Sequence, residues 1–264
     1  MKMFRFILIA VLGVVLGSAQ AQAQTPAAGG TQRLRVKGIK SALGKMDAAS
    51  RDKTRAAGES FEVEEADLAE GAQLEKSKAR QCFYCGTMMM EVMGKSVYNP
   101  AKADNPKAKK RVAAYFKRLR RSFRAVGIEA AAQADLDEVA AAFQQGDLDA
   151  LGAALEKLSG TVQDNLEEAL GPDANWYYGL GYSAKGYKLA GQARLYDMVS
   201  LIAPTPEDLL SYTPDKVDQK VTTALGDLQP VSQKSEDEIG PRDYVLLKSK
   251  STVILNAFRK PRPK

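Results

Sequence analysis

The segment from Gly171 to Ile202 reads GPDANWYYGLGYSAKGYKLAGQARLYDMVSLI and gives the clearest indication of the architecture. Pro172 near its start and Pro204 after its end predict one long helix, capped by Asp173, that reaches Ile202. Small residues recur along it at steps of four and three, and small side chains let another helix approach closely. We therefore expect a helix central to a bundle, with two stripes along it: apolar Trp176, Leu180, Tyr187, Leu195, Met198 and Ile202, and small Gly179, Ser183, Gly186, Ala190 and Ala193.

Helical periodicity continues on both sides of this segment. Glu64 to Met93 contains no proline, and residues of one helical face recur there at spacings of three and four. Asn105-Pro106 then fits an N-cap followed by the first helical residue. The next stripe also steps by four and three, as a core-facing helix requires: Val112, Phe116, Leu119, Phe123 and Val126.

Glycines followed by capping residues predict where helices end. Gly146-Asp147 separates two short helices over 136–145 and 148–158, and Gly160-Thr161 predicts a further stop and start. Thr205-Pro206 and Thr213-Pro214 predict two helix starts, and Gly226 closes the second of these helices. Residues 244–258 fit either a helix or a strand. The fold class is therefore all-α, as an irregular multi-helix bundle or a helical-hairpin array, and it leaves open a short strand near the N-terminus of the mature chain, around Leu34 and Val36.

The first residues have the three parts of a secretory signal. Lys2 and Arg5 precede an apolar run over 6–16, and Ala21-Gln22-Ala23 is an A-x-A cleavage pattern. A membrane anchor is the alternative, but as a helix this run rises only about 16 Å, roughly half of a hydrocarbon core. We expect a periplasmic or secreted chain with a signal peptide over 1–23, a largely disordered linker over 24–58, a helical domain over 59–203, a C-terminal helical segment packed on it over 204–258 and a basic tail over 259–264.

The composition excludes several classes of site. None of the 264 residues is histidine, so Ser-His-Asp hydrolysis, Cys-His proteolysis and His-ligated zinc are ruled out. The chain also has no Walker A loop, no dinucleotide-binding glycine motif after a strand and no nucleophile-elbow motif. A glycosidase remains open, because its two carboxylates need not lie near each other in sequence. These absences favour a protein that binds over one that catalyses.

The most unusual local feature is CFYCGTMMMEVM over 82–93, which holds both cysteines. Cys82, Cys85 and Met89 share one helical face, at spacings of three and four. Three interpretations stand: core packing with an incidental or structural Cys82–Cys85 disulfide, a redox-active pair, and a soft-metal site for Cu(I). The redox interpretation is weakened because the thioredoxin-like motif follows a strand, and here the preceding pattern is helical.

The second candidate surface is a basic amphipathic helix. Residues 105–128 contain no acidic residue and nine cations, which accompany the apolar stripe of the same segment. Such a helix suits an anionic envelope surface or an acidic protein, whereas export argues against nucleic acid. Carboxylates on neighbouring helices could instead neutralise it. The candidate partner surface is Lys117, Arg118, Arg120, Arg121 and Arg124.

The sequence thus predicts a soluble, exported helical protein that binds or scaffolds, with a basic helix contacting anionic partners. The alternative function is thiol-redox or Cu(I) chemistry at Cys82, Cys85 and Met89. No other cofactor, no nucleic acid and no membrane span after leader removal are expected.

Overall fold

A computed structural model describes residues 78–96 and 106–258 without interruption, together with residues 34–36, 39–40, 44, 47, 49–50 and 53. All of these belong to one compact unit, Thr31–Lys264. The predicted leader over 1–23, most of the linker over 24–58 and the basic tail over 259–264 lie outside the described residues.

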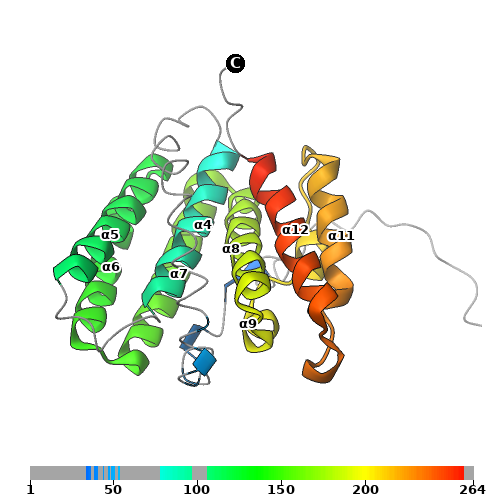
Figure 1. The fold of residues 1–264 in the computed structure, drawn as a ribbon. Helices are drawn as coiled ribbons and strands as arrows, with labels where there is room; N and C mark the ends of the chain where they lie inside the picture. The colour runs from blue at the N-terminus through cyan, green and yellow to red at the C-terminus, as the bar shows by residue number, and fades with distance from the viewer. Residues whose placement is uncertain are drawn as a thin grey trace, which may run out of the picture. The chain divides into compact units, whose positions relative to one another are not determined.

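The described residues are helical and contain no strand, which confirms the all-α prediction. Residues 244–258, which fitted either state, lie almost wholly in the last helix, and no described residue around Leu34 and Val36 forms a strand. Figure 1 shows the helices, which are α4 (Lys78–Ser96), α5 (Pro106–Val126), α6 (Glu129–Gln145), α7 (Leu148–Leu170), α8 (Pro172–Ala193), α9 (Tyr196–Leu201), α10 (Pro206–Ser211), α11 (Gln219–Ser232) and α12 (Pro241–Ala257).

The predicted long helix to Ile202 is wrong, because the chain breaks at Arg194. Arg194 adopts a left-handed backbone conformation with φ 54°, and its N–H donates to the carbonyl of Ala190. This conformation ends α8, and α9 starts two residues later in a new direction. The start differs as well, since Gly171 occupies the N-cap position and Asp173 lies inside the first turn.

Two predicted helix ends are also wrong. Helix α7 runs through Gly160-Thr161, and α11 runs through Gly226. Helix α11 also begins at Gln219, capped by the Asp218 side chain, and not at Thr213-Pro214. A Cβ atom added at Gly160 or Gly226 would meet nothing within 4 Å, so both glycines lie on open helix surface. A glycine ends a helix only where the backbone turns left-handed, as it does at Gly146 with φ 73°.

Helix α8 lies between α4 and α12, and its residues are buried almost without interruption (Figure 1). Its approach to α4 is reciprocal. A Cβ on Gly181 would lie 1.9 Å from the Phe83 carbonyl oxygen, and a Cβ on Gly86 would lie 1.9 Å from that of Tyr178. These two glycines let the backbones touch, so the prediction of a central helix is confirmed.

The predicted small-residue stripe faces a different partner. Gly179 and Gly186 pack against Pro204 and Ile202, in the chain that returns over α8 after α9. Ser183 Oγ donates to the Pro204 carbonyl at 2.6 Å. The small-residue stripe therefore packs against the segment from Ile202 to Pro204. The closest approach between helices occurs instead at Gly86 and Gly181, which are not part of the stripe.

A short N-terminal piece packs on α7. Leu34, Val36 and Ile39 are buried in the core although they lie within the predicted linker. The buried Gln163 side chain accepts from the Val36 N–H at 2.9 Å and donates to the Leu34 carbonyl at 3.1 Å. This amide satisfies one buried carbonyl and one buried N–H of the segment 34–36, which is how irregular chain can enter a core.

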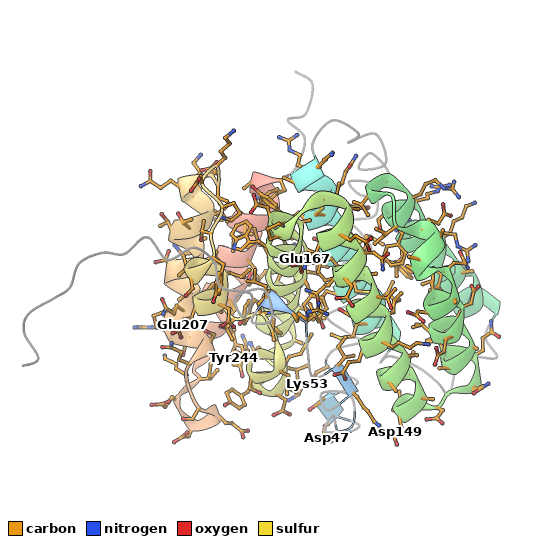
Figure 2. All side chains as sticks on the ribbon, turned by 180° about the vertical axis from the view of Figure 1, so that it is seen from behind. Asp47, Lys53, Asp149, Glu167, Glu207 and Tyr244 are labelled. Atoms are coloured by element: carbon orange, nitrogen blue, oxygen red, sulfur yellow. The ribbon has the colours of Figure 1, made fainter. Side chains whose placement is uncertain are left out.

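Charged side chains gather at the outside of this arrangement. Asp149 at the start of α7 and Glu207 at the start of α10 are exposed, and Figure 2 shows both at the periphery. Asp149 lies in the first turn of its helix, where a carboxylate is favoured by the helix dipole.

Candidate functional site

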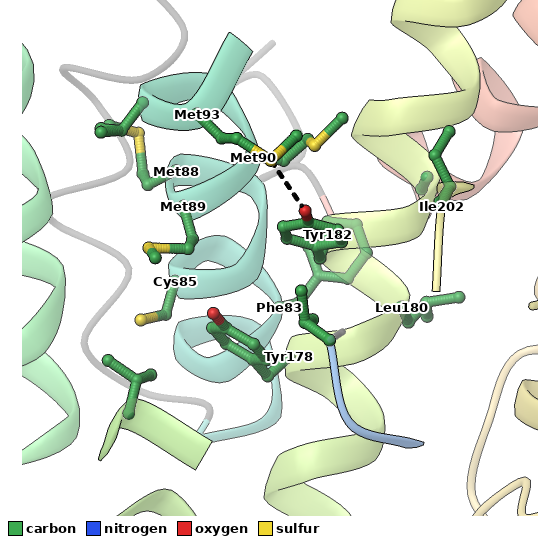
Figure 3. Close-up of a cluster of buried hydrophobic side chains, with 14 of the residues drawn as sticks. Phe83, Cys85, Met88, Met89, Met90, Met93, Tyr178, Leu180, Tyr182 and Ile202 are labelled. Carbon is green, nitrogen blue, oxygen red and sulfur yellow. Dashed lines mark hydrogen bonds between the residues drawn. The ribbon is translucent and has the colours of Figure 1, made fainter. Parts of the chain in front are cut away.

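The sulfur atoms of α4 point into the protein. Cys82 is 1% exposed, and Cys85 and Met89 are 0% exposed. Met88 and Met90, which lie to either side of the predicted face, are equally buried. Figure 3 shows the sulfurs of Cys85 and Met89 on one side of α4 and Met90 on the side of α8. Helix α4 is therefore enclosed all around at this level.

Cys85 lies where four helices meet. Ser122 Oγ of α5 lies 3.9 Å from Cys85 Sγ, and the same hydroxyl donates to the Leu119 carbonyl at 2.7 Å. Tyr178 of α8 turns its hydroxyl toward this side, within 3.2 Å of Ser159 Oγ on α7 (Figure 3). The thiol thus borders a small buried group of hydroxyls, and its contact with Ser122 is weak because one hydroxyl has one proton.

Burial keeps both thiols protonated. Removal from water raises the pKa of Cys82 to about 12, against smaller lowering effects from its backbone hydrogen bond and the Lys78 charge. The pKa of Cys85 is also raised, first by burial and then by the neighbouring Cys82. Both cysteines are free thiols in the structure. At neutral pH neither is a nucleophile in this closed state, because nucleophilic attack needs the thiolate.

Aromatic rings cover the Cys82 end of α4. The Phe83 and Phe258 rings stack with centroids 4.0 Å apart, and Tyr177 meets Phe258 edge-on at 5.9 Å. Burial first, then the Asp173 and Cys82 charges, raise the pKa of Tyr177. Tyr177 and Phe258 are half-buried, and Phe258 is the C-cap residue of α12. The end of the last helix therefore covers Phe83, the residue next to Cys82.

Four cations form an exposed surface on α5. We call Lys117, Arg120, Arg121 and Arg124 the basic face. Arg120 pairs with Asp137 at 3.3 Å, and Arg124 pairs with Glu129 at 2.6 Å, both across to α6. Among the described residues no carboxylate lies within ion-pair distance of Lys117 or Arg121. Carboxylates of the described residues therefore neutralise the basic face only in part.

Arg118 differs from its four neighbours. It is half-buried, and its guanidinium lies 5.7 Å from the centroid of the Tyr115 ring. The pKa of Tyr84 on α4 is raised by burial and by the Glu91 charge, and the Arg118 charge partly offsets that rise. Arg118 thus lies on the inner side of α5, where it contributes to packing between helices.

Sequence reasoning missed the residues that shape these sites from other elements. Ser122, Tyr178, Tyr177 and Phe258 come from three helices, and no spacing along the chain links them to the cysteines. The predictions of a Cys82–Cys85 disulfide, a redox pair and a Cu(I) site stay predictions. Within the described part of the chain, no three Cys, Asp or Glu side chains are grouped as a metal ion would need.

No described helix combines the length and the apolar character needed to cross a membrane. In comparisons with known proteins, no family model, no curated protein and no solved structure matches this chain.

Proposed function

We propose that this chain is an exported helical binding protein whose basic face contacts an anionic surface of the cell envelope. The signal-like leader supports export, because a basic start, an apolar run and an A-x-A pattern occur together there. The observation that carries the proposal is the pair Lys117 and Arg121. They project from the same face of α5 as Arg120 and Arg124, and no described carboxylate pairs with them.

The geometry suits a lipid surface of anionic headgroups. Exposed cations one helical turn apart can approach a plane of phosphates together, and each contributes about 1 kcal/mol near such a surface. The apolar side of α5 is not available for insertion, because Leu119 and Phe123 are 0% exposed. Binding is therefore electrostatic and should weaken as salt rises.

The test is sedimentation of the full chain with vesicles containing an anionic phospholipid such as phosphatidylglycerol. Lys117→Glu combined with Arg121→Glu removes two attractive charges, worth about 2 kcal/mol, so the partition coefficient should fall at least roughly thirtyfold. The matched control is Lys216→Glu with Lys220→Glu, which makes the same charge change with the same spacing at exposed positions of another surface.

The control should bind nearly as well as the unchanged chain. Equal loss in both double variants would show that only net charge matters. Undiminished binding by the Lys117/Arg121 variant would refute the role of the basic face.

A further inference from the structure

The two thiols of α4 suggest a chemistry that the basic face does not use. Cys82 and Cys85 are one helical turn apart, and both are free and buried. Positions three apart in an α-helix have Cα atoms about 5 Å apart, within the range that a disulfide spans. The pair can therefore be joined with a local adjustment of one turn of α4.

We infer that Cys82 and Cys85 form a dithiol–disulfide couple that exchanges with disulfide compounds, with Cys82 as the attacking thiol and Cys85 as the resolving thiol. The inference does not rest on the proposed function, because it concerns α4 and not the outer surface of α5.

The order of attack follows from position. Cys82 is the fifth residue of α4, and the next residue, Phe83, stacks on the half-buried Phe258. Helix ends open locally at low free energy, and Phe258 is the C-cap residue of α12. Cys85 is 0% exposed and lies deeper, against Ser122 of α5. A reagent that enters from the end of the bundle therefore meets Cys82 first, and local opening there relieves the burial that raises the pKa of this thiol.

The exchange balances with glutathione disulfide as the oxidant. The Cys82 thiolate attacks one sulfur of glutathione disulfide, which releases one glutathione thiolate and leaves a mixed disulfide on Cys82. The Cys85 thiolate then attacks the Cys82 sulfur, which forms the intramolecular disulfide and releases the second glutathione. The two protons from the cysteines pass to the two glutathione thiolates.

Charge distinguishes this chemistry from metal binding at the same atoms. A disulfide is neutral, so it can replace two neutral thiols in an apolar interior. A Cu(I) ion held by two thiolates carries a net negative charge, and an uncompensated buried charge is costly. Met89 would add a neutral ligand and would not change that balance.

The experiment equilibrates the full chain in glutathione buffers of graded oxidised-to-reduced ratio, blocks the remaining thiols and counts them by intact mass. The unchanged protein should pass from two free thiols to none in one step. Cys85→Ser should accumulate a glutathione adduct on Cys82, whereas Cys82→Ser should form its adduct at least about tenfold more slowly.

A folded protein that keeps both thiols in the most oxidising buffer, while the urea-unfolded chain oxidises, would overturn the inference. Equal rates of adduct formation in the two single variants would overturn the assigned order of attack. If a variant does not fold, the thiol count of the unchanged chain still decides whether the couple exists.

Two further measurements separate the alternatives. Phe258→Ala should speed oxidation several-fold, whereas Val253→Ala, at an exposed position of the same helix, should not; equal rates would refute entry beneath Phe258. A coloured Cu(I) chelator, mixed with the reduced protein, should keep its metal. Transfer of one Cu(I) per chain that depends on both cysteines would replace the disulfide assignment with a metal site.

Discussion

The α4–α8 contact and the α5–α6 contact hold neighbouring helices together in opposite ways. At the first, Gly86 and Gly181 bring the two backbones into direct contact. At the second, exposed ion pairs join the helices at their outer edge, Arg120 with Asp137 and Arg124 with Glu129. The first contact tolerates no added atom, whereas the second tolerates most substitutions. The tightest backbone packing and the exposed charged side chains therefore belong to different pairs of helices.

The largest expected effect is at the glycine contact. Gly181→Ala places a Cβ 1.9 Å from the Phe83 carbonyl oxygen, which belongs to backbone and cannot move aside alone. The free energy of unfolding should fall by about 3 kcal/mol or more, measured by urea denaturation. Gly160→Ala is the control, because nothing lies within 4 Å of its added Cβ. It should raise stability by up to about 1 kcal/mol, and similar losses in both would contradict the reciprocal contact.

The next effect concerns the buried carboxylate of Asp135 on α6. Burial acts to raise its pKa, but hydrogen bonds from Thr161 at 2.5 Å and Lys157 at 3.0 Å outweigh burial and lower the pKa from its ordinary value. A lowered folded-state pKa gives stability that is present above the unfolded-state value and is lost as pH falls through the folded-state value.

Asp135→Asn should therefore lower stability by about 2 kcal/mol at pH 7 and flatten the loss of stability below about pH 4. Urea midpoints at a series of pH values measure both. An unchanged slope in acid would show that other carboxylates dominate.

A smaller effect separates the two sides of α5. Arg118→Ala removes a guanidinium that lies over the Tyr115 ring, so stability should fall by about 1 kcal/mol. Arg121→Ala changes an exposed position and should leave the urea midpoint unaltered. Vesicle binding should respond in the reverse order, with the larger loss at Arg121. The same response at both positions would remove the distinction between an inner and an outer side.

The smallest effect is at the edge of the basic face. Glu129→Gln removes the carboxylate that pairs with Arg124 and so leaves one more uncompensated cation. Affinity for anionic vesicles should rise about threefold, and the rise should disappear in high salt. Lower affinity would mean that Glu129 positions Arg124 for the partner.

Several elements could be predicted from local patterns. The apolar stripe that includes Leu119 and Phe123 describes the buried side of α5, because a period of 3.6 residues is a property of one helix. The cap at Thr205 with Pro206 was equally readable, and the Thr205 hydroxyl accepts from the Asp208 N–H at 3.2 Å. Glycine was less informative, since Gly160 and Gly226 lie inside helices and the break after α8 occurs at Arg194.

The candidate sites show the same division. Their spacing of three and four residues predicted that Cys82, Cys85 and Met89 share one helical face. The sequence also predicted that the cations of 105–128 belong to one helix. It did not indicate that Phe258, far along the chain, would stack on Phe83 beside Cys82. It also gave no reason to separate Arg118 from Arg121, because residues three positions apart on a helix are neighbours on its surface. What packs beside each of them decides the difference.

The helical class, the leader-like start, the absence of histidine chemistry and the grouping of sulfur and of positive charge can be read from the order of residues. They depend on composition and on neighbours within a few residues. The inward orientation of the sulfurs and the exposure of part of the basic helix come instead from the packed fold. Burial and charge compensation are set by helices distant in sequence, whose side chains meet only after the chain has packed.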